Sequence, residues 1–468
     1  MFCRYFRLAV ISLLFSCVPL LADSATTLSP GLREKIDAIV SEELARTGVP
    51  SASLAIVKDG KIAYLHAYGD ARMEPRRAAQ PEMRYSIGSI SKQFTVAGLL
   101  LLQEQGKLSL DDKVAKYVPD LERGNEVTIR QLLSHTSGYQ DFWPQDYCMP
   151  FILQPTTAEK IMDRWARKPL DFDPGTKWQY SNTNFVIAGV IVEKASGEPF
   201  MRFLREKVLA PVGILHAADT DQEQLGPGDA TGYIRYGIGP LRLAPAEGKG
   251  WMFAAGELGL TAEDLAKWDL SILHQTLLKP ESYREFETEV LLKNGAGTRY
   301  GLGVDIELER GHRVLSHSGE VSGFTAQNAV YPDDGVAVVA LTNQDASAAA
   351  GQIARAVGPV VLVGDDPEDG RKTEQARRIF EGLQRGTVDR TLFTEDANFY
   401  FSDEALKDFA SGLAPLGAPR GFVLTNQSLR GGMKMRSYTL YFPGKTLRAW
   451  TYELPDGKLE QYQVEEQQ

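Results

Sequence analysis

Residues 85–94 read YSIGSISKQF, and the rest of the chain is best understood outward from this stretch. Helix-forming and apolar residues follow it up to Gly106, which predicts a buried helix over 90–105. Ser89 precedes this helix at the predicted N-cap, where free N–H groups and the helix dipole stabilise negative charge. Lys92 lies on the same face, so its amine can reach the Ser89 oxygen. A serine needs such a neighbour to act as a nucleophile at neutral pH.

The Ser-x-x-Lys spacing is weak evidence by itself, because it occurs about once or twice by chance in a chain of this length. Two further short motifs follow it. Residues 180–182 read YSN, and on an extended segment the tyrosine and the asparagine would point to the same side. Residues 317–319 read HSG in a strand-like region. Taken singly, Tyr180 and His317 are also compatible with a core tyrosine and a strand histidine without a catalytic role.

The composition describes a large folded protein. The chain has 468 residues, of which 43% are hydrophobic and 24% charged, enough for a large core and two domains. Its net charge of −10 and the lack of a Lys/Arg block argue against a nucleic-acid partner. We find neither Cys-x-x-Cys nor His-Glu-x-x-His, so the sequence predicts no metal site, and we expect no cofactor.

The first 22 residues have the pattern of a signal peptide, with a cut after residue 22 or 24. Arg4 and Arg7 precede an apolar run over 8–21, which is too short for a stable membrane span. We therefore expect an exported protein, periplasmic or extracellular. A lipid anchor at Cys17 is disfavoured, because the apolar run continues past it. Once the signal is removed, Cys148 alone remains, so no intramolecular disulfide is expected.

The pattern over 31–363 predicts one α+β domain, an antiparallel sheet flanked by helices with a helical insert. An amphipathic helix ending at Gly48 is followed by a hairpin over 53–66 with an Asp-Gly turn. After the helical middle, alternating apolar residues predict four strands. These strands and a closing small-residue helix cover 301–308, 313–317, 325–331, 336–342 and 346–361.

A second, smaller α+β domain is predicted at 373–468, after a polar linker at 364–372. Two helices are expected first, followed by four strands between 422 and 464. This order is similar to the cone fold of nuclear transport factor two-like domains. We expect the domain to stabilise the protein or to shield the mouth of the active site.

The three motifs together resemble those of the serine β-lactamase and penicillin-binding-protein superfamily, in particular its class C β-lactamase and DD-carboxypeptidase branch. The motifs follow one another in the same order as in that family. The predicted helices and strands around them, over about 31–363, also match the family's arrangement. Family-like phrases support the match at 132–138, 174–176 and 254–264. Within the first of these, we expect His135 to make a structural hydrogen bond rather than to act in catalysis.

The resemblance implies a role for each motif residue. Ser89 would attack an acyl carbonyl and hold it as an ester, and Lys92 and Tyr180 would share the proton transfers. Which of these two is the general base stays open. The backbone N–H groups of Ser89 and Glu320 would form the oxyanion hole. The substrate-binding residues that the resemblance implies are Asn182, His317, Ser318, Gly319 and Glu320.

The resemblance implies a secreted serine hydrolase that forms an acyl-enzyme on Ser89. We expect a DD-peptidase-like activity on D-amino-acid peptides or related amides, so the partners would be small molecules or peptides. The oligomeric state stays open. His317 stands where many family members have lysine, which resembles the DD-peptidase-like members and weakens the case for efficient penicillin hydrolysis. The alternatives are a carboxylesterase or weak β-lactamase at the same site, or a non-catalytic penicillin-binding-type protein. A Ser-His-Asp esterase is disfavoured, because the chain has no Gly-x-Ser-x-Gly elbow.

Overall fold

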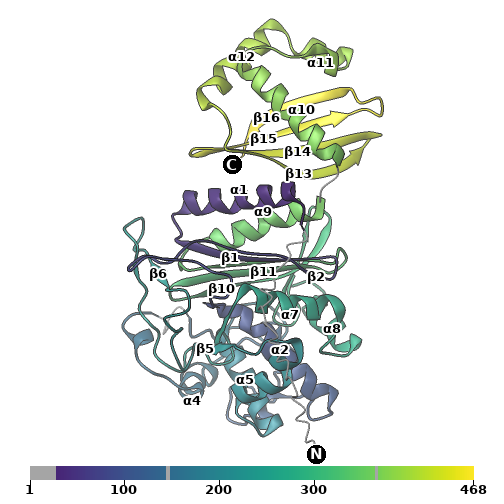
Figure 1. The fold of residues 1–468 in the computed structure, drawn as a ribbon. Coiled ribbons are helices and arrows are strands. Elements are labelled where there is room, and N and C mark those ends of the chain that lie inside the picture. Colours follow the sequence, from purple (N-terminus) through teal and green to yellow (C-terminus); the bar gives the residue numbers. More distant parts are fainter. Residues whose placement is uncertain (1–27, 144–147, 364–366, 468) are drawn as a thin grey trace, which may run out of the picture.

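The computed structural model describes residues 28–143, 148–363 and 367–467. The predicted signal peptide lies outside these ranges. Figure 1 shows a large sheet with helices on one face, a mainly helical region on the other, and a smaller domain at the C-terminal end. The predicted α+β class with an antiparallel sheet flanked by helices is confirmed.

The central sheet joins the two ends of the large domain. Within the described residues it has seven strands in the order β3-β2-β1-β12-β11-β10-β9, and every pair of neighbours is antiparallel. The N-terminal hairpin pairs with the later strands through β1 and β12, where Ala55 lies opposite Val339. The strands are β1 (Ser51–Lys58), β2 (Lys61–Arg72), β3 (Arg77–Ala78), β9 (Asp305–Glu309), β10 (His312–Val321), β11 (Phe324–Tyr331) and β12 (Val336–Thr342).

The central strands are buried on both faces, so their alternate residues enter two different cores. On β1, Leu54 and Ile56 pack with α1 (Pro30–Thr47) and α9 (Ala349–Val363). Ala55 and Val57 belong to the core of the helical region on the other face. The helices of that region are α2 (Ser91–Glu104), α3 (Ile129–Leu133), α4 (Ala158–Ile161), α5 (Asn182–Ser196), α6 (Phe200–Leu204), α7 (Ala262–His274) and α8 (Pro280–Phe286).

The start of α2 differs from the prediction. A 3₁₀ turn over Gly88–Ile90 precedes the helix, so Ser89 lies inside the turn and is not the N-cap residue. Gly88 has a φ of 51°, a left-handed conformation that suits glycine and turns the chain sharply before the serine. The Ser89 hydroxyl is therefore not used for capping and remains available to side chains from other elements.

The smaller domain packs three helices against a four-stranded antiparallel sheet within 367–467. The prediction that 364–372 is a linker is wrong from residue 367 onwards, because α10 begins at Pro367. Proline is favoured at the first position of a helix, and Asp369 in the first turn is paired with the buried Arg436. The elements are α10 (Pro367–Gln384), α11 (Glu395–Tyr400), α12 (Asp403–Leu413), β13 (Gly421–Arg430), β14 (Met433–Phe442), β15 (Lys445–Glu453) and β16 (Leu459–Glu466).

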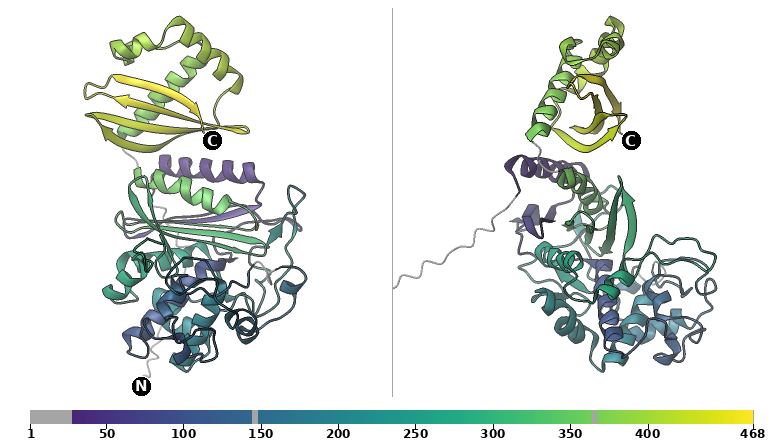
Figure 2. Two further views of the ribbon diagram at one scale, coloured as in Figure 1. Left: turned by 180° about the vertical axis from the view of Figure 1, so that it is seen from behind. Right: turned by 90° about the vertical axis from the view of Figure 1, so that its right-hand side faces the viewer.

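The C-terminal domain lies against α1 and α9, on the side of the large domain away from the helical region (Figures 1 and 2). Strand β13 forms most of the contact. Phe422 and Leu424 face the core of the small domain, whereas Val423 is buried in the cluster formed by α1 and α9. Arg420 adds an ion pair with Glu42 at 3.5 Å. The two domains thus share one apolar contact with a polar edge.

No helix in the described ranges has the length and apolar character needed to cross a membrane.

We expect Val423→Asp to separate the two domains. Val423 is 2% exposed at the contact, so an aspartate there would be an unpaired charge against apolar helices. The penalty of roughly 3 kcal/mol should loosen docking and leave the core of each domain intact. Scanning calorimetry should then show two transitions, and limited proteolysis should release the domains. Leu429→Asp, on the same strand but 81% exposed, is the matched control and should change neither measurement.

Candidate active site

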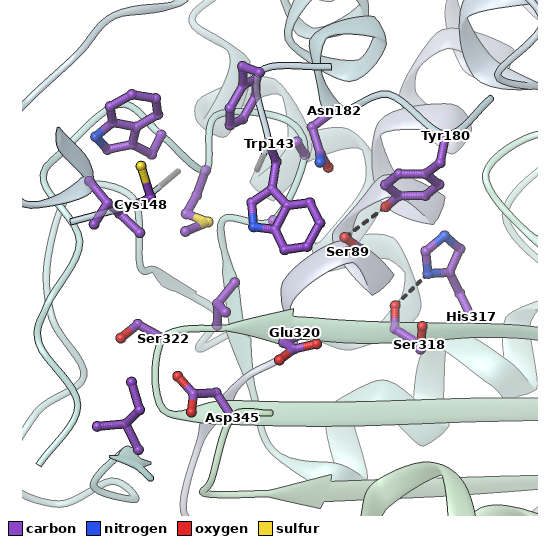
Figure 3. Close-up of a pocket in the computed structure, with 18 of the residues that line it drawn as sticks. Ser89, Trp143, Cys148, Tyr180, Asn182, His317, Ser318, Glu320, Ser322 and Asp345 are labelled. Carbon is purple, nitrogen blue, oxygen red and sulfur yellow. Dashed lines mark hydrogen bonds between the residues drawn. The ribbon is translucent and has the colours of Figure 1, made fainter. Parts of the chain in front are cut away.

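The structure brings the three motifs together around the Ser89 hydroxyl. Ser89 comes from the 3₁₀ turn, Lys92 from the first turn of α2, and Tyr180 from the extended segment before α5. The Ser89 Oγ lies 2.9 Å from both the Lys92 Nζ and the Tyr180 hydroxyl. Figure 3 shows Tyr180 pointing at Ser89 from above β10. The predicted catalytic residues are therefore in direct hydrogen-bond contact.

The amine of Lys92 is fully buried and has three neighbours. Besides Ser89, it contacts the Asn182 Oδ1 at 2.8 Å and the Ala255 carbonyl oxygen at 2.7 Å. These two oxygens can only accept hydrogen bonds. A neutral amine would donate its two N–H groups to them and direct its lone pair at the Ser89 hydroxyl. This is the arrangement that a general base requires.

The two candidates for the general base have opposite pKa shifts. Burial lowers the pKa of Lys92 to about 7, against the opposing effect of the Asp141 and Glu257 carboxyls. Burial of its hydroxyl raises the pKa of Tyr180 well above the ordinary range, although the bond to Ser89 acts in the other direction. The structure therefore favours a neutral Lys92 as the base and a protonated Tyr180, a choice that the sequence left open.

The second half of β10 forms the wall opposite α2. Strand β9 pairs only with the first half, up to Ser316, so the edge of residues 317–321 faces the turn that carries Ser89. A Cβ at Gly319 would lie 1.9 Å from the Ile87 carbonyl oxygen, and a Cβ at Gly88 would lie 2.7 Å from the Glu320 nitrogen. Both positions thus require glycine. The close approach places the Glu320 N–H beside the Ser89 turn, as the predicted oxyanion hole requires.

His317 lines the cavity as predicted, but it provides no positive charge. Its Nδ1 lies 2.6 Å from the Ser318 carbonyl oxygen, which can only accept, so this nitrogen carries the proton and donates. Its Nε2 then accepts from the Tyr300 hydroxyl at 3.0 Å. Burial and the neighbouring Lys92 lower the pKa of His317 to about 3. The histidine is therefore neutral where a lysine would be charged.

His135 has a structural hydrogen bond, as expected. Its Nδ1 accepts from the Ser181 N–H at 3.2 Å, and its ring packs 4.3 Å from that of Tyr180, centre to centre. The residue is buried and has a φ of 57°. These contacts hold the segment between Tyr180 and Asn182 in place.

Sequence reasoning missed Asp141, which contacts Asn182, and the cavity residues Tyr300, Asp305 and Asp345. Asp141 lies three residues after the family-like phrase at 132–138, in an irregular loop, and this proximity was the available signal. The spacing of Tyr300, Asp305 and Asp345 in the sequence does not relate them to Ser89. They lie near it only because the central sheet brings distant segments together.

Ser89 opens into a cavity of about 670 Å³. One wall is apolar and comes from two loops, with Phe142, Trp143, Ile152, Trp251 and Met252 among its residues. Among the described residues that line the cavity there are three carboxyls and no lysine or arginine. The carboxyls belong to Asp305, Glu320 and Asp345, and the last two lie close to each other in Figure 3.

The expectation that the C-terminal domain shields the mouth of the site is wrong. All the residues found to line the cavity belong to the large domain, within 89–345. The small domain packs on α1 and α9, which lie on the opposite face of the central sheet.

A family model described as Beta-lactamase matches residues 36–360. The chain belongs to the beta-lactamase family. Among curated members, it is 28% identical over 311 residues to penicillin-binding protein 4* of Bacillus subtilis, a match that covers 63% of this chain and 68% of that protein. It is 30% identical over 307 residues to the D-aminopeptidase of Brucella anthropi, covering 64% of this chain and 57% of the relative. The chain thus spans little more than half the length of that D-aminopeptidase.

Solved structures of this family have the same fold. The D-amino acid amidase from Ochrobactrum anthropi SV3 is 25% identical, with a TM-score of 0.62 over 71% of this chain and 96% of that one. The octameric penicillin-binding protein homologue from Pyrococcus abyssi is 24% identical, with a TM-score of 0.63 over 92% of this chain and 99% of that one. The latter likeness extends into the C-terminal domain and shows the fold alone.

The pH dependence of kcat/KM should reflect the titration of Lys92 rather than that of Tyr180. Only the neutral amine can accept the Ser89 proton, so kcat/KM should rise with pH through about 7, the pKa of Lys92. Tyr180→Phe should lower turnover by ~100-fold and retain this rise, whereas Lys92→Ala should lose both turnover and the rise. A pH profile of each variant distinguishes the two residues. A rise that disappears in Tyr180→Phe would assign the base to the tyrosine instead.

Proposed function

We propose that this protein is a serine hydrolase that cleaves amides or peptides of D-amino acids through an acyl-enzyme on Ser89. The observation that carries the proposal is the Ser89 hydroxyl held at 2.9 Å by both Lys92 and Tyr180 at the cavity. Relatives named as a D-aminopeptidase and a D-amino acid amidase support the substrate class.

The proposed reaction uses these groups in sequence. Lys92 takes the hydroxyl proton as the Ser89 oxygen bonds to the substrate carbonyl carbon, and the carbonyl electron pair moves to oxygen beside the N–H groups of Ser89 and Glu320. Collapse of this intermediate breaks the C–N bond. The leaving amine receives the proton from Lys92 by way of the Tyr180 hydroxyl. Water then attacks the ester in the same way and releases the acid.

The charge of the cavity favours substrates with a free ammonium group. A carboxylate beside Glu320 and Asp345 would be repelled, whereas an ammonium would be attracted. Neutral His317 does not offset these acids. An N-terminal D-residue or a D-amino-acid amide suits this cavity better than a C-terminal D-Ala-D-Ala peptide or a penicillin, both of which carry a carboxylate. This disfavours the DD-peptidase-like substrates expected from the sequence, and with them the weak β-lactamase and penicillin-binding alternatives.

A second candidate activity is the cleavage of carboxylic esters. The apolar wall formed by Trp143, Trp251 and Met252 supports it, because such a surface accepts uncharged acyl groups. We also propose that the protein is exported, on the basis of the signal-peptide pattern at 1–22.

The test compares the hydrolysis of D-phenylalanine amide with that of its L-enantiomer and its N-acetyl derivative. We expect the D-amide to be cleaved at least ~10-fold faster than the L-amide, and acetylation to reduce kcat/KM by about tenfold because it removes the ammonium. Asp345→Asn should weaken the preference for the free amine, and Ser89→Ala should abolish cleavage. Faster cleavage of p-nitrophenyl esters, with no amide cleavage, would favour the esterase. A stable Ser89 adduct with penicillin would favour the penicillin-binding alternative.

A further inference from the structure

Asp141 lies behind Asn182, outside the cavity lining, and makes three hydrogen bonds. Its Oδ1 accepts from the backbone N–H groups of Asn182 at 2.9 Å and Trp143 at 3.2 Å. Its Oδ2 lies 3.3 Å from the Asn182 side-chain nitrogen. One carboxylate therefore contacts both the backbone and the side chain of Asn182.

This contact decides which way the Asn182 amide points. A carboxylate can only accept hydrogen bonds, so the amide must turn its NH₂ group towards Asp141. The amide oxygen then faces the Lys92 amine at 2.8 Å. Because that oxygen takes one of the two N–H groups of a neutral amine, the lone pair of Lys92 is left for Ser89. The sequence of contacts runs from Asp141 through Asn182 and Lys92 to the nucleophile.

Asp141 also provides the nearby negative charge. Two acids act on Lys92, and burial raises the pKa of Glu257 to about 8, so that this carboxyl is protonated at pH 7. Burial raises the pKa of Asp141 only to about 6, so it is ionised at pH 7. The remaining groups that face the amine are Tyr180, which is protonated, and the histidines His135 and His317, whose low pKa values keep them neutral.

We propose that Asp141 is a positioning residue that fixes the Asn182 amide and so directs the lone pair of Lys92 at Ser89. The proposal rests on Lys92 being the general base of the proposed function. It does not depend on the substrate, because it concerns the nucleophile alone.

The test measures the nucleophilicity of Ser89 without a substrate. Phenylmethanesulfonyl fluoride modifies activated serines, and intact mass gives the rate from pH 5 to 9. In Asp141→Asn the new NH₂ group opposes that of Asn182, which should misdirect the amide and slow modification by ~100-fold. Loss of the negative charge lowers the pKa of Lys92, so the rise of the rate with pH should move to lower pH. Failure of D-amide hydrolysis would overturn the proposed substrate and leave this experiment valid.

The exchange variant Asp141→Asn with Asn182→Asp supplies the decisive comparison. It restores the donor and acceptor match, since the new amide can donate to the new carboxylate, and that carboxylate still accepts from Lys92. We expect at least ~10-fold recovery over the single variant at pH 9. The modification rate should rise at a higher pH than in the wild type, because the negative charge is now next to the Lys92 amine and raises its pKa.

Asp229→Asn is the matched control. Its carboxylate likewise accepts from two backbone N–H groups, those of Arg84 and Gly226 at 3.2 and 2.9 Å, with no hydrogen bond to Asn182 or Lys92. Its pH profile should match that of the wild type. A wild-type rate and profile in Asp141→Asn would overturn the proposal. A second result would also overturn it: slow modification of Asp141→Asn with the rise of the rate at the wild-type pH, and no recovery in the exchange variant. That result would indicate a purely structural role for Asp141. If Asp141→Asn does not fold, the exchange variant is compared with Asn182→Asp alone, in which two carboxylates face each other, and equal rates in the two would overturn the proposal.

Discussion

The burial of the Lys92 amine is the interaction on which the active site depends. An amine removed from water is stable only if its hydrogen-bonding groups are satisfied and its charge is lost or balanced. The two oxygens that satisfy it come from Asn182 and Ala255, which lie 90 and 163 residues away along the chain. The fold must therefore hold α2, α5 and the loop before β8 (Leu258–Leu260) together before the serine can be activated.

The central sheet supplies the rigidity that this arrangement needs. It joins the N-terminal hairpin to the later strands through β1 and β12, and its β10 edge runs against the turn that carries Ser89. A side chain at Gly319 would collide with the backbone of that turn. The nucleophile is thus held between a buried helix and a strand edge, with its hydroxyl open to the cavity.

The cavity has His317 at the position where the family resemblance implies lysine in many members. Family membership fixes the machinery, whereas the charges around the mouth decide which substrates approach it. Here a neutral histidine replaces a cation, and the carboxyls of Asp305, Glu320 and Asp345 line the space. The proposed preference for substrates with a free ammonium group rests on this arrangement of charges.

The sequence by itself determined the hairpin, the later strands, the α+β class and the residues that surround Ser89, because these follow from local periodicity and from three ordered motifs. It misplaced Ser89 at an N-cap and the start of α10 within a linker, since polar composition does not show which side chains have distant partners. Only the tertiary structure decided that the pKa of Lys92 is lowered to about 7, that His317 is uncharged and that Asp141 holds Asn182. Each of these depends on burial or on contacts between residues far apart in the chain, which no local pattern encodes.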